Sequence, residues 1–192
     1  MFEITQYLPT LKKLQSQQSE YNGRFYIDYN GEIKMTYQKG QIMETCFLGC
    51  LANWHTHPND YINLYPDHPS IIDFKYIYNM TCRSRLVGSH LIFTPKYIYV
   101  IKYRCGDVLK NTLAEIENIG ESIQNLDRSS YVFREYYFKK MRQIGFDIKI
   151  YNWHDKIYIE DVHVNTMIYT FIKYVILIIF FVSIVNIFFS NK

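Results

Sequence analysis

The chain has 192 residues, of which 48% are hydrophobic and 20% are charged, and its formal net charge is +3. This composition supports a packed domain of ordinary size and excludes wholesale disorder. A small net charge without a long run of Lys and Arg does not favour nucleic-acid binding. We therefore expect one folded domain over residues 1–160 and no nucleic-acid partner.

The hydrophobic pattern predicts an α/β (α+β) domain with a mixed β-sheet flanked by helices. The first predicted element is an amphipathic helix over residues 2–18, which Pro9 interrupts. The predicted strands are Arg24–Tyr29, Glu32–Tyr37, Ile42–Trp54, His90–Phe93 and Lys96–Tyr103, and an Asn30-Gly31 turn joins the first two. Further helices are predicted over 70–80, 109–126 and 130–144, and a final pair of strands over 147–151 and 156–159.

Residues 167–189 are almost entirely apolar, and Lys173 is their one charged residue. A membrane-spanning helix needs about 20 apolar residues, and a buried core helix fits less well because this segment has no polar face. We expect a C-terminal transmembrane helix here. The N-terminus lacks a signal-peptide pattern, so we expect a single-pass tail anchor, a domain facing the cytosol and free thiols at the four cysteines.

Two histidines directly follow the predicted strand that ends at Trp54. His55 and His57 are separated by one residue, so both side chains point to the same side of an extended chain. Neutral imidazoles arranged in this way suit Zn²⁺. A pair of surface histidines without a metal is the alternative interpretation.

Asp73 is the candidate for a third ligand. If Ser70 begins the next helix, Asp73 lies in the first turn and can face the histidines. Three protein ligands and a water make the open, catalytic form of a zinc site. Ser70 and Asp73 also fit a plain helix-capping motif with no metal.

Glu20 comes before the first predicted strand, where its carboxylate could take a proton from an attacking water. An ordinary exposed glutamate is the alternative interpretation, and Glu32 and Glu44 compete for the same role.

Two cysteines offer a different zinc site. Cys46 and Cys50 have a spacing found in structural sites, and His55 and His57 follow them. Buried thiols without a metal are the better interpretation of this apolar segment.

The order of these motifs resembles the JAMM/MPN+ metalloproteases, also called JAB-domain peptidases. The family pattern is an upstream Glu, then H-x-H-P, then S-x-x-D. This chain has Glu20, the run His55-Thr56-His57-Pro58, and Ser70 followed by Asp73, in that order. The resemblance covers residues 2–103. The loop 59–69 is longer than is usual in the family, which costs little entropy, and the substitutes if Asp73 does not reach are Asp60, Asp67 and His68.

The resemblance implies a JAB/MPN-like fold with zinc bound by His55, His57 and Asp73. It implies that Glu20 is the general acid/base and that Ser70 helps to hold the tetrahedral intermediate. The implied reaction is hydrolysis of isopeptide or peptide bonds of ubiquitin or a ubiquitin-like protein, by a zinc enzyme anchored to a membrane. A non-catalytic scaffold of the same fold and a membrane protein with a structural zinc are the alternatives.

Overall fold

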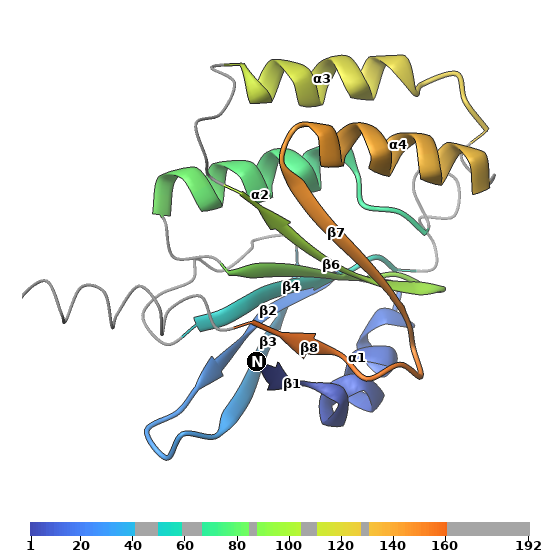
Figure 1. The fold of residues 1–192 in the computed structure, drawn as a ribbon. Helices are drawn as coiled ribbons and strands as arrows, with labels where there is room; N and C mark the ends of the chain where they lie inside the picture. Colours follow the sequence, from blue (N-terminus) through green and yellow to red (C-terminus); the bar gives the residue numbers. More distant parts are fainter. Residues whose placement is uncertain (41–49, 59–66, 85–87, 105–110, 128–130, 161–192) are drawn as a thin grey trace, which may run out of the picture.

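The computed structural model describes residues 1–40, 50–58, 67–84, 88–104, 111–127 and 131–160 of the chain (Figure 1). Its centre is a six-stranded sheet with the order β3-β2-β4-β5-β6-β7. β4 and β5 run parallel, whereas the other neighbouring strands run antiparallel. The mixed sheet confirms the predicted fold class. The strands are β2 (Tyr21–Ile27), β3 (Ile33–Lys39), β4 (Cys50–Thr56), β5 (Ser89–Phe93), β6 (Tyr97–Tyr103) and β7 (Phe146–Asn152).

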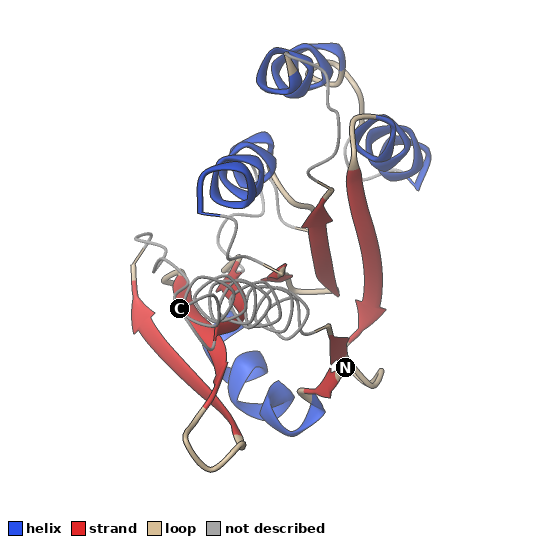
Figure 2. Ribbon diagram, turned by 60° about the vertical axis from the view of Figure 1, so that its left-hand side comes forward, coloured by secondary structure: helices blue, strands red, loops and turns tan. Residues whose placement is uncertain are grey.

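Helices flank the sheet on both faces. α2, α3 and α4 lie on one face, whereas α1 and a two-stranded ribbon of β1 and β8 lie on the other (Figures 1 and 2). Their bounds are α1 (Leu8–Gln15), α2 (Ile71–Ser84), α3 (Thr112–Ser122), α4 (Tyr131–Gln143), β1 (Phe2–Glu3) and β8 (Tyr158–Ile159), and a short 3-10 helix, Thr5–Tyr7, precedes α1.

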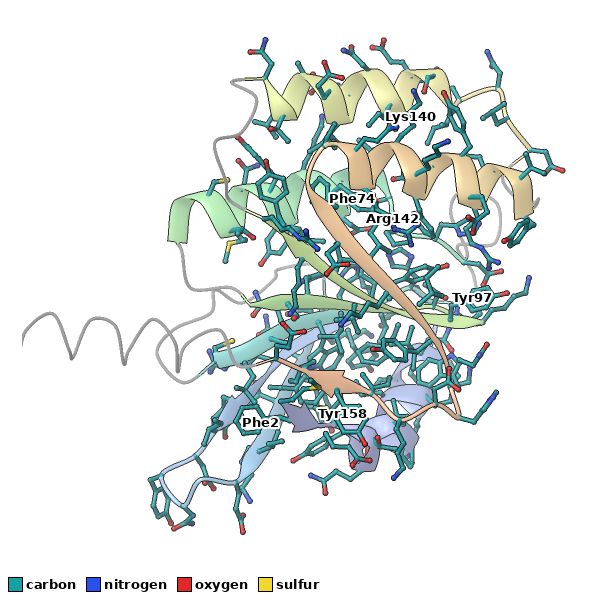
Figure 3. The ribbon with its side chains drawn as sticks, in the orientation of Figure 1. Phe2, Phe74, Tyr97, Lys140, Arg142 and Tyr158 are labelled. Atoms are coloured by element: carbon teal, nitrogen blue, oxygen red, sulfur yellow. The ribbon has the colours of Figure 1, made fainter. Side chains whose placement is uncertain are left out.

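Each face of the sheet has its own hydrophobic core. Alternate strand residues point to opposite faces, so Ile92 packs beneath α2 to α4, whereas its neighbour Leu91 packs on the α1 side. Phe74, on α2, belongs to the first core (Figure 3). Trp54 of β4 belongs to the second core, so His55 beside it faces α2. This alternation directs the side chain of His55 toward α2.

The predicted hairpin of β2 and β3 is confirmed. Its turn contains Asn30 and Gly31, and Gly31 has a φ of 79°, a conformation that glycine adopts without steric cost. The Asp28 carboxylate accepts hydrogen bonds from the backbone N–H groups of Asn30 and Glu32, both at 2.9 Å. The hairpin therefore carries Glu32 in its turn, at an exposed position.

The first helix is shorter than predicted. It begins at Leu8 and ends at Gln15, because Pro9 is tolerated only in the first turn of a helix. Residues 2–3, which were expected to be helical, instead form β1, where Phe2 pairs with Ile159.

The last two strands do not pair with each other, contrary to the prediction. β7 adds to the sheet beside β6, where Val100 lies opposite Lys149. β8 pairs with β1 near the start of the chain, and Phe2 and Tyr158 lie close together in Figure 3. Strand partners so distant in sequence leave no local pattern from which to predict them.

The predicted transmembrane helix, residues 167–189, lies outside the described residues. Within the parts of the chain that the structure describes, there is no helix with the length and apolar character needed to span a membrane.

Candidate metal centre

The two histidines lie at the end of a central strand. β4 is paired with β2 on one side and with β5 on the other. The His57 backbone N–H donates to the carbonyl of Phe93 at 2.8 Å, and the Gln15 side chain donates to the carbonyl of His57 at 3.1 Å. The backbone of both histidines is therefore fixed, and His55 is almost completely buried, with 1% of its surface exposed.

Asp73 is held at the start of α2 by a capping box. The Ser70 backbone N–H and hydroxyl both donate to Asp73 Oδ2, at 2.6 and 2.8 Å, and the Asp73 N–H donates to Ser70 Oγ at 3.2 Å. Such reciprocal bonds satisfy the free N–H groups of a helix start. The capping hydrogen bonds predicted for these two residues are thus present, and the cap also directs Asp73 toward the histidines.

The three predicted ligands meet. His55 Nε2 lies 3.1 Å from Asp73 Oδ1 and 3.0 Å from His57 Nε2, and His57 Nε2 lies 3.5 Å from Asp73 Oδ2. Ligand atoms held tetrahedrally at zinc distances of about 2.0–2.1 Å stand roughly 3.3 Å apart. The observed separations lie on both sides of that value, so His55, His57 and Asp73 form a group that could bind a metal ion.

Two hydrogen bonds from the histidines to Asp73 do not fit this arrangement. If both histidines donated to Asp73 through Nε2, their two N–H groups would face each other across 3.0 Å. A cation removes this conflict, because both imidazoles can then direct a lone pair at it. The geometry therefore fits a metal ion better than it fits two histidines that both donate to Asp73.

The carboxylate and the histidines affect each other's ionisation. Burial favours the neutral form of Asp73, but the adjacent His55 and His57 outweigh it and hold the pKa of this carboxyl well below its ordinary value. Burial likewise lowers the pKa of His55, but the attraction and hydrogen bond of Asp73, together with the charge of Glu20, raise it overall. The site thus holds an ionised carboxylate, which is the form that binds cations.

Glu20 lies beside the three ligands. In the pairing of β2 with β4, Asn22 lies opposite His55, and the Tyr21 N–H donates to Thr56 Oγ1 at 2.9 Å. This register brings Glu20 Oε1 to 3.9 Å from His55 Nε2, with 17% of the Glu20 side chain exposed. The glutamate is therefore on the ligand-facing side of His55 and is accessible to water.

Glu20 and Asp73 both reach the metal centre, so the site does not require the other candidates for the general base and for the third ligand. Glu32 lies in the hairpin turn and pairs with Lys34, whereas Glu44 and Asp60 lie outside the described residues. Asp67 pairs with Lys96 at 2.8 Å. The remaining substitute, His68, contacts the Tyr99 hydroxyl at 3.3 Å within an aromatic cluster.

Cys50 cannot be a ligand of the alternative, cysteine-based zinc site. Cys50 is disulfide-bonded, so it has no thiolate to offer a metal. The expectation of free thiols is wrong for this residue. Cys46 lies outside the described residues.

His90 is a site residue that the sequence analysis missed. It lies on β5, and its Nε2 atom is 2.9 Å from Nδ1 of His55, on the opposite side of that ring from the ligand cluster. Burial, and then the charge of His55, lower the pKa of His90 to about 3, so this imidazole is neutral. The available signal was a single histidine in a short strand that is otherwise largely apolar.

No protein-family model, no curated protein and no solved structure matches this chain. The resemblance to the JAMM/MPN+ family therefore depends on the motif residues of this chain.

Proposed function

We propose that this protein is a zinc-dependent metallopeptidase that hydrolyses isopeptide or peptide bonds and is anchored to a membrane. The observation that supports this most directly is the position of Glu20. Its carboxylate lies 3.9 Å from His55 Nε2, next to a group of two imidazoles and one carboxylate. A structural metal site has no need of an additional, partly accessible carboxylate.

Zinc is the metal that these donors favour. Two neutral imidazoles and one carboxylate are the ligands of well-known catalytic zinc sites, whereas calcium and magnesium prefer oxygen ligands alone. Bound zinc supplies Lewis acidity to the scissile carbonyl and to the attacking water. Three protein ligands leave room for such a water, as hydrolysis requires.

Glu20 is the general base and general acid in this proposal. Its carboxylate accepts a proton from the attacking water and then donates that proton to the leaving amine. Because 17% of the side chain is exposed, solvent and substrate can reach the carboxylate. The backbone bond from the Gly40 N–H to the Glu20 carbonyl, at 2.9 Å, fixes the position of this residue.

Ser70 is the donor to the developing oxyanion. Its hydroxyl now donates to Asp73 Oδ2 at 2.8 Å, and a rotation about one side-chain bond redirects the proton. Its backbone N–H keeps the contact with the carboxylate at 2.6 Å. Asp73 therefore stays oriented while the hydroxyl serves the reaction.

The resemblance to the JAMM/MPN+ family supports ubiquitin or a ubiquitin-like protein as the substrate. The apolar segment 167–189 supports the membrane anchor. The disulfide at Cys50 is unusual for a domain in the cytosol, where thiols are kept reduced. Protease protection of the protein in sealed vesicles will show which side the domain occupies.

The test uses the full-length chain in detergent with linear and isopeptide-linked di-ubiquitin and with a ubiquitin-like protein fused at its C-terminus. Cleavage that a zinc chelator abolishes and added zinc restores supports the proposal. Stoichiometric zinc without cleavage of any of these substrates would instead support the non-catalytic scaffold.

A further inference from the structure

We propose that His90 is a positioning residue of the metal centre, which accepts a hydrogen bond from His55 and so directs the Nε2 lone pair of His55 at the metal. This inference deepens the proposed function at the same site, but it depends only on metal binding and not on the identity of the substrate.

The contact between the two rings is short and buried. His55 Nδ1 and His90 Nε2 lie 2.9 Å apart, and each residue has 1% of its surface exposed. A hydrogen bond between two imidazole nitrogens contains one proton, so one ring donates and the other accepts. Water cannot readily replace either partner at this depth.

The ligand geometry decides which ring donates. His55 turns Nε2 toward His57 and Asp73, at 3.0 and 3.1 Å. A neutral imidazole that binds a metal through Nε2 carries its proton on Nδ1. The donor is therefore His55 Nδ1, and the acceptor is the unprotonated Nε2 of His90.

The backbone holds His90 at the required place. β4 and β5 are parallel neighbours, and their register sets Asn53 opposite His90 and His55 opposite Ile92. His90 also packs against Tyr76 of α2, with ring centroids 5.5 Å apart. The acceptor is thus fixed by the sheet on one side and by the helix that carries Asp73 on the other.

A carboxylate or a backbone carbonyl usually holds a metal-binding histidine in this way, and loss of the partner typically weakens metal binding about 10- to 100-fold. A histidine in this role adds no negative charge. Asp73 and Glu20 then remain the two carboxylates near the metal within the part of the chain that the structure describes.

The first experiment is NMR of the full-length protein, labelled with ¹⁵N at histidine, in detergent, saturated with zinc and, for comparison, without metal. We expect a coupling through the hydrogen bond between His55 Nδ1 and His90 Nε2, with the one-bond N–H splitting on His55 Nδ1. A splitting on His90 Nε2 in the zinc-bound protein, or the absence of the coupling both with and without zinc, would overturn the inference.

The second experiment is zinc titration of His90→Leu and His90→Gln. Leucine removes the acceptor and should weaken zinc binding about 10- to 100-fold. Glutamine offers a carbonyl oxygen and should restore binding to near the wild-type value. Equal affinities of His90→Leu and wild type, or failure of His90→Gln to restore binding, would show that His90 only fills space.

Ile92→Val is the matched control for packing. Ile92 is buried on the same strand and the same face, and it lies opposite His55 without donating or accepting a hydrogen bond through its side chain. The Ile92→Val variant should leave the zinc affinity and the coupling between His55 and His90 unchanged. Absence of zinc binding in wild type would refute the proposed function, whereas a reversed or missing hydrogen bond in a protein that binds zinc would refute only the role of His90.

Discussion

Glu20 Oε1 lies 3.9 Å from His55 Nε2, although one residue precedes β2 and the other belongs to β4. The antiparallel pairing of these strands creates this proximity, because it sets Asn22 opposite His55. Glu20→Gln should therefore abolish hydrolysis, since an amide cannot accept the proton of the water. Zinc binding should persist, because the three ligands are unchanged.

The control for this variant is Glu32→Gln, in the exposed hairpin turn, which should keep both activity and zinc. Turnover and metal content, measured on the same preparations, distinguish a role of Glu20 in proton transfer from a role in metal binding. Full turnover in Glu20→Gln would exclude Glu20 as the general base.

Ser70 has two roles that substitution can separate. Ser70→Ala removes the N-cap hydroxyl, which should lower the free energy of unfolding by about 0.5–2 kcal/mol. The same change removes the proposed oxyanion donor, which should lower kcat about 10²- to 10³-fold. Ser70→Gly should lose a similar factor in rate, but only a few tenths of a kcal/mol of stability, because glycine is a tolerated N-cap.

Chemical denaturation and turnover of the two Ser70 variants measure these effects independently. If kcat falls more in Ser70→Ala than in Ser70→Gly, in parallel with the loss of stability, the hydroxyl acts through the helix cap alone.

The ligands could be predicted from the sequence because each belongs to a short local motif. His55 and His57 are one residue apart at the end of β4, and Ser70 and Asp73 form the cap at the start of α2. Glu20 could be assigned only through the family resemblance, since its approach depends on the β2–β4 pairing.

His90 could not be predicted in the same way. It is 35 residues from His55, and the two rings meet only because β4 and β5 are parallel neighbours joined through α2. Periodicity identifies a strand but not its partner. The pairing of β1 with β8, at opposite ends of the described domain, was missed for the same reason.

The segment that leads into α2 is fixed by Tyr99. Its buried hydroxyl donates to the backbone carbonyl of Asp67 at 2.5 Å and contacts His68 at 3.3 Å. Tyr99→Phe should lower the free energy of unfolding by about 0.5–1.5 kcal/mol. It should also weaken zinc binding, because the segment precedes the helix start that carries Asp73.

Tyr103→Phe is the matched control. Tyr103 is also buried on β6, and its hydroxyl bonds at 3.3 Å to Oγ1 of Thr112, the first residue of α3. The control should lose comparable stability and keep the zinc affinity of wild type. If the two variants bind zinc with equal affinity, the Tyr99 contact does not influence the metal centre.

The dependence of stability on pH should differ between the metal-free and the zinc-loaded protein. Without metal, Asp73 has a lowered pKa and stabilises the fold above its ordinary value of 3.8, an effect that is lost as the pH falls through the lowered pKa. His55 has a raised pKa and stabilises the fold below its ordinary value of 6.5, an effect that is lost as the pH rises through the raised pKa. The contribution of this pair is therefore greatest between these two values.

With zinc bound, the stability of the fold should increase with pH above pH 6.5, whereas without metal it should decrease. It competes with protons for His55, so zinc binding and the stability it confers increase as the pH rises. Thermal unfolding with excess zinc and with chelator, measured on both sides of pH 6.5, gives the comparison. Parallel curves would mean that no metal binds to this pair.

The central claim is that His55, His57 and Asp73 hold a zinc ion, and metal analysis of the full-length protein purified without added metal tests it most directly. We predict one zinc per chain in the wild-type protein and none in His57→Ala, with both proteins folded by circular dichroism. A folded wild-type protein without stoichiometric zinc, or equal zinc in the two proteins, would contradict the account.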